Sequence, residues 1–248
     1  MINISEIVST WEVKDGWSIS PGVEWCLKGH AVKFDRMVGM GSNTVIGDRV
    51  TIGARAKLGD NVTVKDGASI GAHTNVGAFS YVGKGVVISV FCDISHSVKI
   101  REGSIVGEAT DIAATVQIAE GVRIGDSTAI SVGAWIARGA RVGDEVHIGE
   151  GAVLCEYSVV GDEQSVVEGS TVGHNSTLIC NLGFAEGYYK NLCELDGVAY
   201  IAAGCRWFSL TDAIEHWAAY SRDREMTQAL MLGAVAIAKH RGLRLDDD

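Results

Sequence analysis

The segment TVIGDRVTIGARAKLGDNV at residues 44–62 repeats every six residues, a period that fits neither a helix nor a single strand. In this segment an aliphatic residue precedes a glycine in each repeat. Every sixth residue from Met40 to Leu178 is Ile, Val, Leu or Met, with no polar residue and no shift of frame. The residue two positions earlier is small or β-branched in nearly every repeat, Gln164 being the exception. This alternation predicts short strands, each followed by a corner, with inward and outward side chains.

A second period of 18 residues is set by glycines three positions after the aliphatic residue: Gly67, Gly85, Gly103, Gly121 and Gly139. Glycine is favoured where a turn needs a positive φ, so three hexads are predicted to form one turn of a coil. The same column continues with Tyr157 and Asn175. Asparagine tolerates the left-handed conformation and tyrosine does so poorly, so either the corner changes type at Tyr157 or its backbone is strained.

The unbroken frame over about residues 34–181 resembles that of the hexapeptide-repeat proteins. The resemblance implies an all-β solenoid, a left-handed parallel β-helix of triangular cross-section with about eight coils. Left-handed crossovers depart from the general rule for parallel strands, so the handedness rests on the resemblance alone.

Both ends of the solenoid are expected to be capped, because unpaired strand edges promote aggregation. Residues 1–39, which contain Trp11, Trp17 and Trp25, are assigned to an N-terminal cap, and residues 40–181 to the β-helix. The remaining residues 182–248 are assigned to a C-terminal β-hairpin and helical cap that also serves oligomerisation.

Three features predict the elements of the C-terminal part. The pair Asp196-Gly197 predicts a two-residue hairpin turn that places Cys193 opposite Tyr200 and not Cys205. Ser209 and Asp212 have the spacing of a helix cap, and a longer helix should end near Gly242. The ten apolar residues 229–238 are too few to span a bilayer, and we expect them to be buried, most simply between subunits.

Composition restricts the partners. The formal net charge of −10 and the lack of a basic run argue against binding to duplex nucleic acid. No apolar run of 18 residues and no basic leader predict a protein without a signal peptide or membrane segment. The six cysteines form no CxxC pair, and Cys92 falls in the inward column, so we expect reduced thiols and a cytoplasmic location. No two histidines have the five-residue spacing of the metal-binding branch of the superfamily, so no metal site is expected.

Many hexapeptide-repeat proteins are acyltransferases, in which a coil histidine acts as general base and the acyl donor lies between subunits of a trimer. The resemblance therefore implies a homotrimer that uses acyl-CoA as co-substrate, without a covalently bound cofactor. In the lipid A UDP-N-acetylglucosamine acyltransferases the base stands two residues after an aliphatic hexad residue. His174 and His96 occupy that position here. Glu156, one coil before His174 in the same column, could orient its imidazole ring.

The alternative is a non-catalytic protein that binds or sequesters a small ligand, such as a nucleotide signal. It is favoured because the frame contains no inserted loop, whereas many acyltransferases of this superfamily build their pocket with one. Candidate ligand-binding residues are the stacked pair Arg123 and Arg141 and the outward aromatic residues Phe79, Tyr81, Phe91 and Trp135. His96 lies between Ala78 and Ala114 in its column, which could leave room for a ligand. The segment AGCRWFSLTDAIEHW also resembles the tail of hexapeptide proteins of bacteria and their phages, which implies no particular chemistry.

Overall fold

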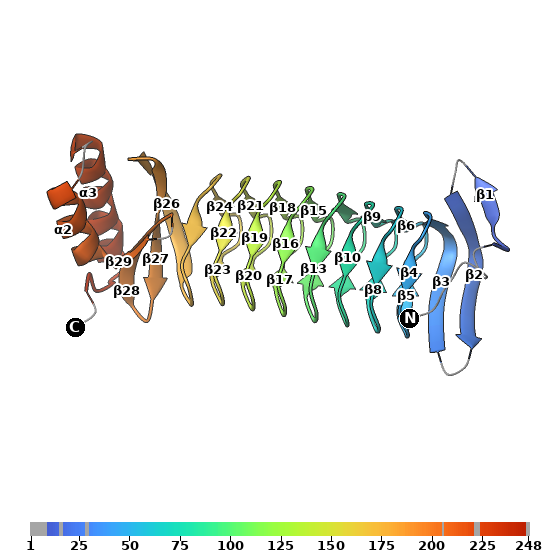
Figure 1. Ribbon diagram of the computed structural model, residues 1–248. Coiled ribbons are helices and arrows are strands. Elements are labelled where there is room, and N and C mark those ends of the chain that lie inside the picture. The colour runs from blue at the N-terminus through green and yellow to red at the C-terminus, as the bar shows by residue number, and fades with distance from the viewer. Residues whose placement is uncertain (1–8, 15–16, 28–29, 205, 221–223, 247–248) are drawn as a thin grey trace.

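The computed structural model describes residues 9–14, 17–27, 30–204, 206–220 and 224–246 of the chain. They form an elongated β-solenoid with an antiparallel strand layer at each end and two helices beyond the C-terminal layer (Figure 1). The strands stack in parallel with partners 18 residues apart, and one face alone contributes eight strands. The fold is therefore the predicted parallel β-helix of about eight coils, consistent with the left-handed form.

Three flat faces make up the solenoid. Face 1 consists of β4 (Val45–Ile46), β7 (Thr63–Val64), β10 (Tyr81–Val82), β13 (Lys99–Ile100), β16 (Gln117–Ile118), β19 (Trp135–Ile136), β22 (Val153–Leu154) and β25 (Thr171–Val172). Face 2 consists of β5 (Val50–Ile52), β8 (Ser69–Ile70), β11 (Val87–Ile88), β14 (Ile105–Val106), β17 (Arg123–Ile124), β20 (Arg141–Val142), β23 (Val159–Val160) and the start of β26 (Thr177–Ala185). Face 3 continues from the end of β3 (His30–Met40) through β6 (Lys57–Leu58), β9 (Asn75–Val76), β12 (Asp93–Ile94), β15 (Asp111–Ile112), β18 (Ala129–Ile130), β21 (His147–Ile148) and β24 (Ser165–Val166).

The core is the aliphatic column that the sequence predicts. Every sixth residue from Met40 to Leu178 is buried, and so is the residue two positions before each, except Gln164. Many of the hydroxyl groups in this second column donate hydrogen bonds to backbone carbonyls of the next coil, as Ser104 does to Ala119 over 2.8 Å. Gln164 lies at the end of the helix, where its side-chain amide donates to the carbonyls of Leu178 and Ile179. The one polar exception therefore saturates the backbone where the coil stops.

The corners are more uniform than the glycine column predicts. Every sixth residue from Met37 to Asn175 has a positive φ, and most of these residues are not glycine. Tyr157 has a φ of 57° and continues the glycine column without a change of corner type, which decides between the two alternatives in favour of a strained backbone. Thr115, a β-branched residue, has a φ of 62°. Stacking between coils therefore imposes the left-handed conformation even on residues that disfavour it.

Three antiparallel strands, β1 (Glu12–Lys14), β2 (Trp17–Leu27) and β3, stand at the N-terminal end (Figure 1). β3 also pairs in parallel with β5, which places Phe34 opposite Ile52. The ring of Trp11 is buried and lies edge-on to Phe34, with 5.1 Å between ring centroids. The side chains of Trp17 and Trp25 fall outside the described part of the structure.

The C-terminal layer contains β26, β27 (Tyr188–Leu195), β28 (Val198–Ala203) and β29 (Arg206–Ser209), and is followed by α2 (Leu210–Tyr220) and α3 (Arg224–His240). The hairpin between β27 and β28 turns at Asp196-Gly197, both with positive φ, and pairs Cys193 with Tyr200 as predicted. Cys205 lies outside the described residues. Ser209 Oγ accepts a hydrogen bond from the Asp212 amide and caps α2.

The prediction that residues 229–238 are buried is only partly correct. Met231, Ala234 and Ala238 are buried against the C-terminal sheet of the same chain, whereas Leu232 is 71% exposed. One face of α3 therefore serves the core of its own chain and the other remains at the surface.

Substitution at Gly103 tests the corner geometry. Gly103 has a φ of 67°, and a Cβ added there would meet no atom within 4 Å. Gly103→Val should therefore destabilise the protein through backbone strain alone, by about 1–3 kcal/mol. Gly103→Asn should cost much less, because asparagine tolerates the left-handed region. Urea unfolding of both variants measures the difference, and equal stability of the two would contradict this account.

Two inward serines test the contribution of the core hydroxyl groups. Ser104 Oγ donates to Ala119 and accepts from the Val122 amide, whereas Ser158 Oγ has no hydrogen-bond partner among the described residues. Ser104→Ala should cost about 1 kcal/mol, while Ser158→Ala should be neutral or stabilising. Thermal unfolding of the two alanine variants compares them at equal burial. A larger loss at Ser158 would show that its hydroxyl has a partner after all.

Candidate functional site

Two adjoining cavities lie along face 1 and the corner between faces 1 and 2, which we call corner A. The first, of about 370 Å³, is lined by Arg101, Gln117, Glu120, Trp135, Arg138 and Glu156 together with small residues. The second, of about 520 Å³, lies between the last coils and the C-terminal sheet and is lined by Val153, Cys155, Thr171, Gly173, His174, Ala202, Gly204, Arg206 and Trp207. Cys155 and Glu156 are consecutive residues, so the two cavities meet at this coil.

The repeat itself aligns the side chains of these cavities. Gln117, Trp135, Val153 and Thr171 are register partners on successive strands of face 1. At corner A the amide of Asn175 donates to the carbonyl of Glu156 over 2.9 Å, which places His174 one coil after Glu156. Both of these side chains are exposed. An imidazole, a carboxylate and an indole thus line one continuous strip of the surface.

The C-terminal sheet provides the remaining wall of the second cavity. The Trp207 ring packs directly over Gly173, where a Cβ would collide with it. The same ring stacks on Tyr200, with 4.8 Å between centroids and an interplanar angle of 7°. Next to it, the Arg206 guanidinium lies 3.2 Å from Nε2 of His216 on α2. Trp207 is therefore held on both sides, while Arg206 stays exposed at the cavity.

The charges along the strip are mixed. In the first cavity Arg101 forms an ion pair with Glu120 over 3.6 Å between exposed side chains. In the second cavity burial, and then the charge of Glu156, raise the pKa of the Cys155 thiol above its ordinary value. The thiol is therefore protonated at neutral pH and contributes as a small, weakly polar group.

Residues 43–78 match the family model described as bacterial transferase hexapeptide (six repeats). The β-helix is a hexapeptide-repeat solenoid. No match was found among curated proteins.

Several solved structures resemble this hexapeptide solenoid at low identity. UDP-N-acetylglucosamine O-acyltransferase from Moraxella catarrhalis is 18% identical, with a TM-score of 0.32 over 59% of this chain and 68% of that one. The Campylobacter jejuni UDP-N-acetylglucosamine acyltransferase is 13% identical, with a TM-score of 0.44 over 58% and 69% of the two chains. A putative acetyltransferase from Bacillus cereus is 16% identical, with a TM-score of 0.34 over 88% and 96%. At these values the likenesses carry no inference about activity or substrate.

Three of the predicted site residues line the adjoining cavities of the hexapeptide solenoid: His174, Glu156 and Trp135. The others lie elsewhere. Arg123 and Arg141 are register partners as predicted, but they belong to face 2. Tyr81 is on face 1, three coils before Trp135, and the Lys65 ammonium lies 5.7 Å from its ring centroid.

The remaining predicted residues surround a groove on face 3. This groove, of about 610 Å³, is lined by Ala78, Asp93 and Ser95 among others, so His96 follows a lining residue directly. Phe79 and Phe91 are 65% and 55% exposed at the two corners that border face 3. His96 Nδ1 lies 3.3 Å from Ser97 Oγ. The two predicted histidines therefore lie near different cavities.

Arg206 and Trp207 are the site residues that sequence reasoning missed. They follow the repeat, so no 18-residue column relates them to His174. The described residues contain no group of three or more His, Cys, Asp or Glu that could hold a metal ion. They also contain no helix long and apolar enough to cross a membrane.

Two glycine substitutions test the contact that forms the second cavity. Gly173→Ala should displace the Trp207 ring and lower the melting temperature, because the new methyl group overlaps the indole. Gly161→Ala is the matched control, since its Cβ would meet only the Gln164 side chain, at 3.7 Å. Tryptophan fluorescence and thermal unfolding report both effects. An unchanged emission spectrum in Gly173→Ala would show that Trp207 does not pack on this coil.

Proposed function

We propose that this protein is an acyl-CoA-dependent acyltransferase that acts as a homotrimer in the cytoplasm. The observation that carries the proposal is that His174, Glu156 and Trp135, selected from the sequence, line two cavities that meet at one coil. Arg138 and Arg206 line the same cavities and supply cationic groups for an anionic substrate such as a CoA ester. The free thiols of Cys92, Cys155, Cys180 and Cys193 support a reducing compartment.

In the proposed reaction the His174 imidazole takes the proton from an acceptor hydroxyl or amine as its oxygen or nitrogen attacks the thioester carbonyl. The carbon–sulfur bond of the acyl donor then breaks, and the departing CoA sulfur receives the proton from the imidazolium. Glu156, one coil away, stabilises the imidazolium through its negative charge. The proton and the acyl group are thus both transferred without a metal or a bound cofactor.

A second candidate function is the sequestration of a nucleotide without catalysis. It is favoured by Trp135, whose side chain is 57% exposed and lines a cavity together with Arg101 and Arg138. An indole can stack on a base while guanidinium groups bind phosphate. Glu120 and Glu156 in the same cavity oppose an anionic ligand, which makes this the weaker candidate.

Substitution of His174 decides between the two functions. If His174 is the general base, His174→Ala should lower turnover by roughly 10²- to 10⁴-fold and leave ligand affinity nearly unchanged. Glu156→Gln should act in the same direction and more weakly, because the base remains. Acyl transfer from several acyl-CoA donors, measured alongside calorimetric binding, provides both readouts. His96→Ala serves as the matched control, since it removes an exposed coil histidine far from these cavities.

Equal turnover in wild type and His174→Ala would remove His174 from the reaction. Binding of a nucleotide that is weakened by Trp135→Ala, in a protein without transferase activity, would establish sequestration instead.

The proposed assembly predicts three chains per particle in light scattering at micromolar concentration. Exposed apolar side chains on α3, such as Leu232 and Met226, support an interface there. Leu232→Glu should therefore shift the particle mass toward one chain, whereas Lys239→Glu on the same helix should not. A wild-type particle with the mass of one chain would contradict the trimer.

A further inference from the structure

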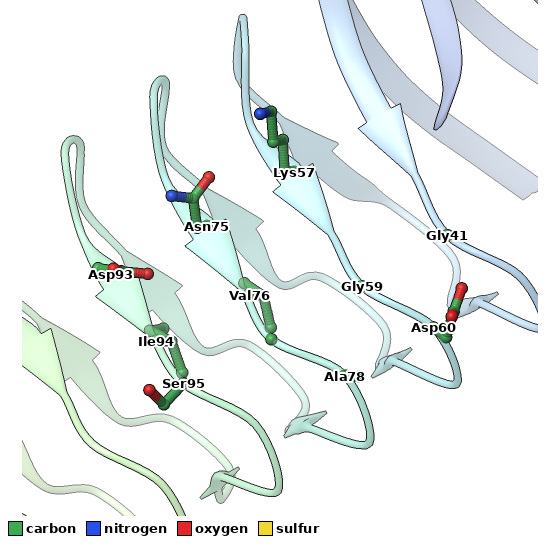
Figure 2. Close-up of a pocket in the computed structure, with 11 residues that line it drawn as sticks. Gly41, Lys57, Gly59, Asp60, Asn75, Val76, Ala78, Asp93, Ile94 and Ser95 are labelled. Atoms are coloured by element: carbon green, nitrogen blue, oxygen red, sulfur yellow. The ribbon is translucent and has the colours of Figure 1, made fainter. Parts of the chain in front are cut away.

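The groove on face 3 is built differently from the corner A cavities. It crosses the coils of β6, β9 and β12, and the outward side chains of Lys57, Asn75 and Asp93 project from the same side of these strands (Figure 2). The three residues are register partners on neighbouring strands, so they stand about 4.8 Å apart along the solenoid. The order along the groove is therefore a donor, an amide that both donates and accepts, and an acceptor.

Small residues form the bottom of the groove next to this polar row. Gly59 and Gly77 lack side chains because their Cβ atoms would meet the backbone of the next coil at 2.6–2.7 Å. Ala78 continues this low strip toward the corner (Figure 2). The close stacking of the coils thus leaves a recess beside the polar row.

Aromatic rings border the groove at both corners of face 3. On one side the Phe79 side chain is 65% exposed, directly after Ala78. On the other side Phe91 stacks on His73, with 5.1 Å between ring centroids and an interplanar angle of 24°. Exposed aromatic rings beside a row of hydrogen-bonding groups offer an apolar surface to one side of a ligand and polar groups to another.

The charges in the groove decide which ligands fit. The lining contains one ammonium, from Lys57, and two carboxylates, from Asp60 and Asp93. Asp111, the next register partner of Asp93, adds a third carboxylate beyond the groove. A phosphate ligand would therefore meet more repulsion than attraction, in a protein whose net charge is already −10. This excludes the anionic ligands considered for corner A.

We propose that the face 3 groove is a binding site for an uncharged saccharide. The hydroxyl groups of a sugar both donate and accept, so they can pair in turn with Lys57, Asn75 and Asp93, and the apolar faces of the rings can lie against Phe79. Three strands span about 10 Å, the length of two linked sugar rings. The site lies several coils from His174 and does not depend on the proposed acyl transfer.

Calorimetry on the full chain with cellobiose, maltose and chitobiose tests the site. At least one disaccharide should bind, and Asn75→Ala should weaken that binding about tenfold, as expected for the loss of hydrogen bonds from a buried ligand edge. Phe79→Ala should weaken it to a similar extent through the loss of ring contact. His147→Ala is the matched control, because His147 occupies the same outward column of face 3 outside the groove.

Spermidine and CoA are titrated in parallel as cationic and anionic probes. Binding of spermidine that responds to Asn75→Ala, while no disaccharide binds, would overturn the saccharide assignment in favour of a polyamine. The proposal also fails if CoA binding responds to Asn75→Ala, or if disaccharide binding is unchanged in both groove variants. Melting temperatures of all variants should match that of the wild type, since the substituted side chains are exposed.

Discussion

Hydrogen bonds between successive coils determine the geometry of the whole solenoid. The amide of Gly47 donates to the carbonyl of Val64 over 2.7 Å, and the amide of Gly83 does the same to Ile100. Bonds of this kind continue from coil to coil, so each residue lies beside the one 18 positions later. A column of side chains in the sequence thereby becomes a row on the surface. Core, corners and both proposed sites follow from this single register.

The register explains why so much of the fold can be predicted from the sequence. The buried column from Met40 to Leu178 and the turn at Asp196-Gly197 are both where the pattern puts them, because each depends on local residue type. The left-handed corners at residues such as Thr115 could not be predicted, since local preference opposes them and only contact between coils enforces them. In the same way Glu156 and His174 are aligned by the repeat, whereas Trp207 reaches Gly173 through the docking of a separate sheet.

That docking depends on buried polar side chains in the C-terminal layer. Asn191 Nδ2 donates to the carbonyl of Thr171, which lines the second cavity, over 2.7 Å. Lys190 is fully buried, donates to the carbonyl of Ala185 over 2.7 Å, and lies 4.9 Å from the ring centroid of Trp217 on α2. Burial lowers the pKa of Lys190 below its ordinary value. These contacts join the last coil, the sheet and α2 into one body, and so fix the wall that carries Arg206.

The 18-residue register also determines how such a chain can change in length. Removing one whole coil shortens the solenoid and leaves every outward row on its own face. Removing a single hexad preserves the buried aliphatic column and the core, but it moves everything that follows to the next face of the triangle. The C-terminal sheet, with Arg206 and Trp207, would then still cap the solenoid while the rows before the deletion kept their old faces. In this architecture the core tolerates changes in units of six, whereas sites built from outward rows tolerate them only in units of 18.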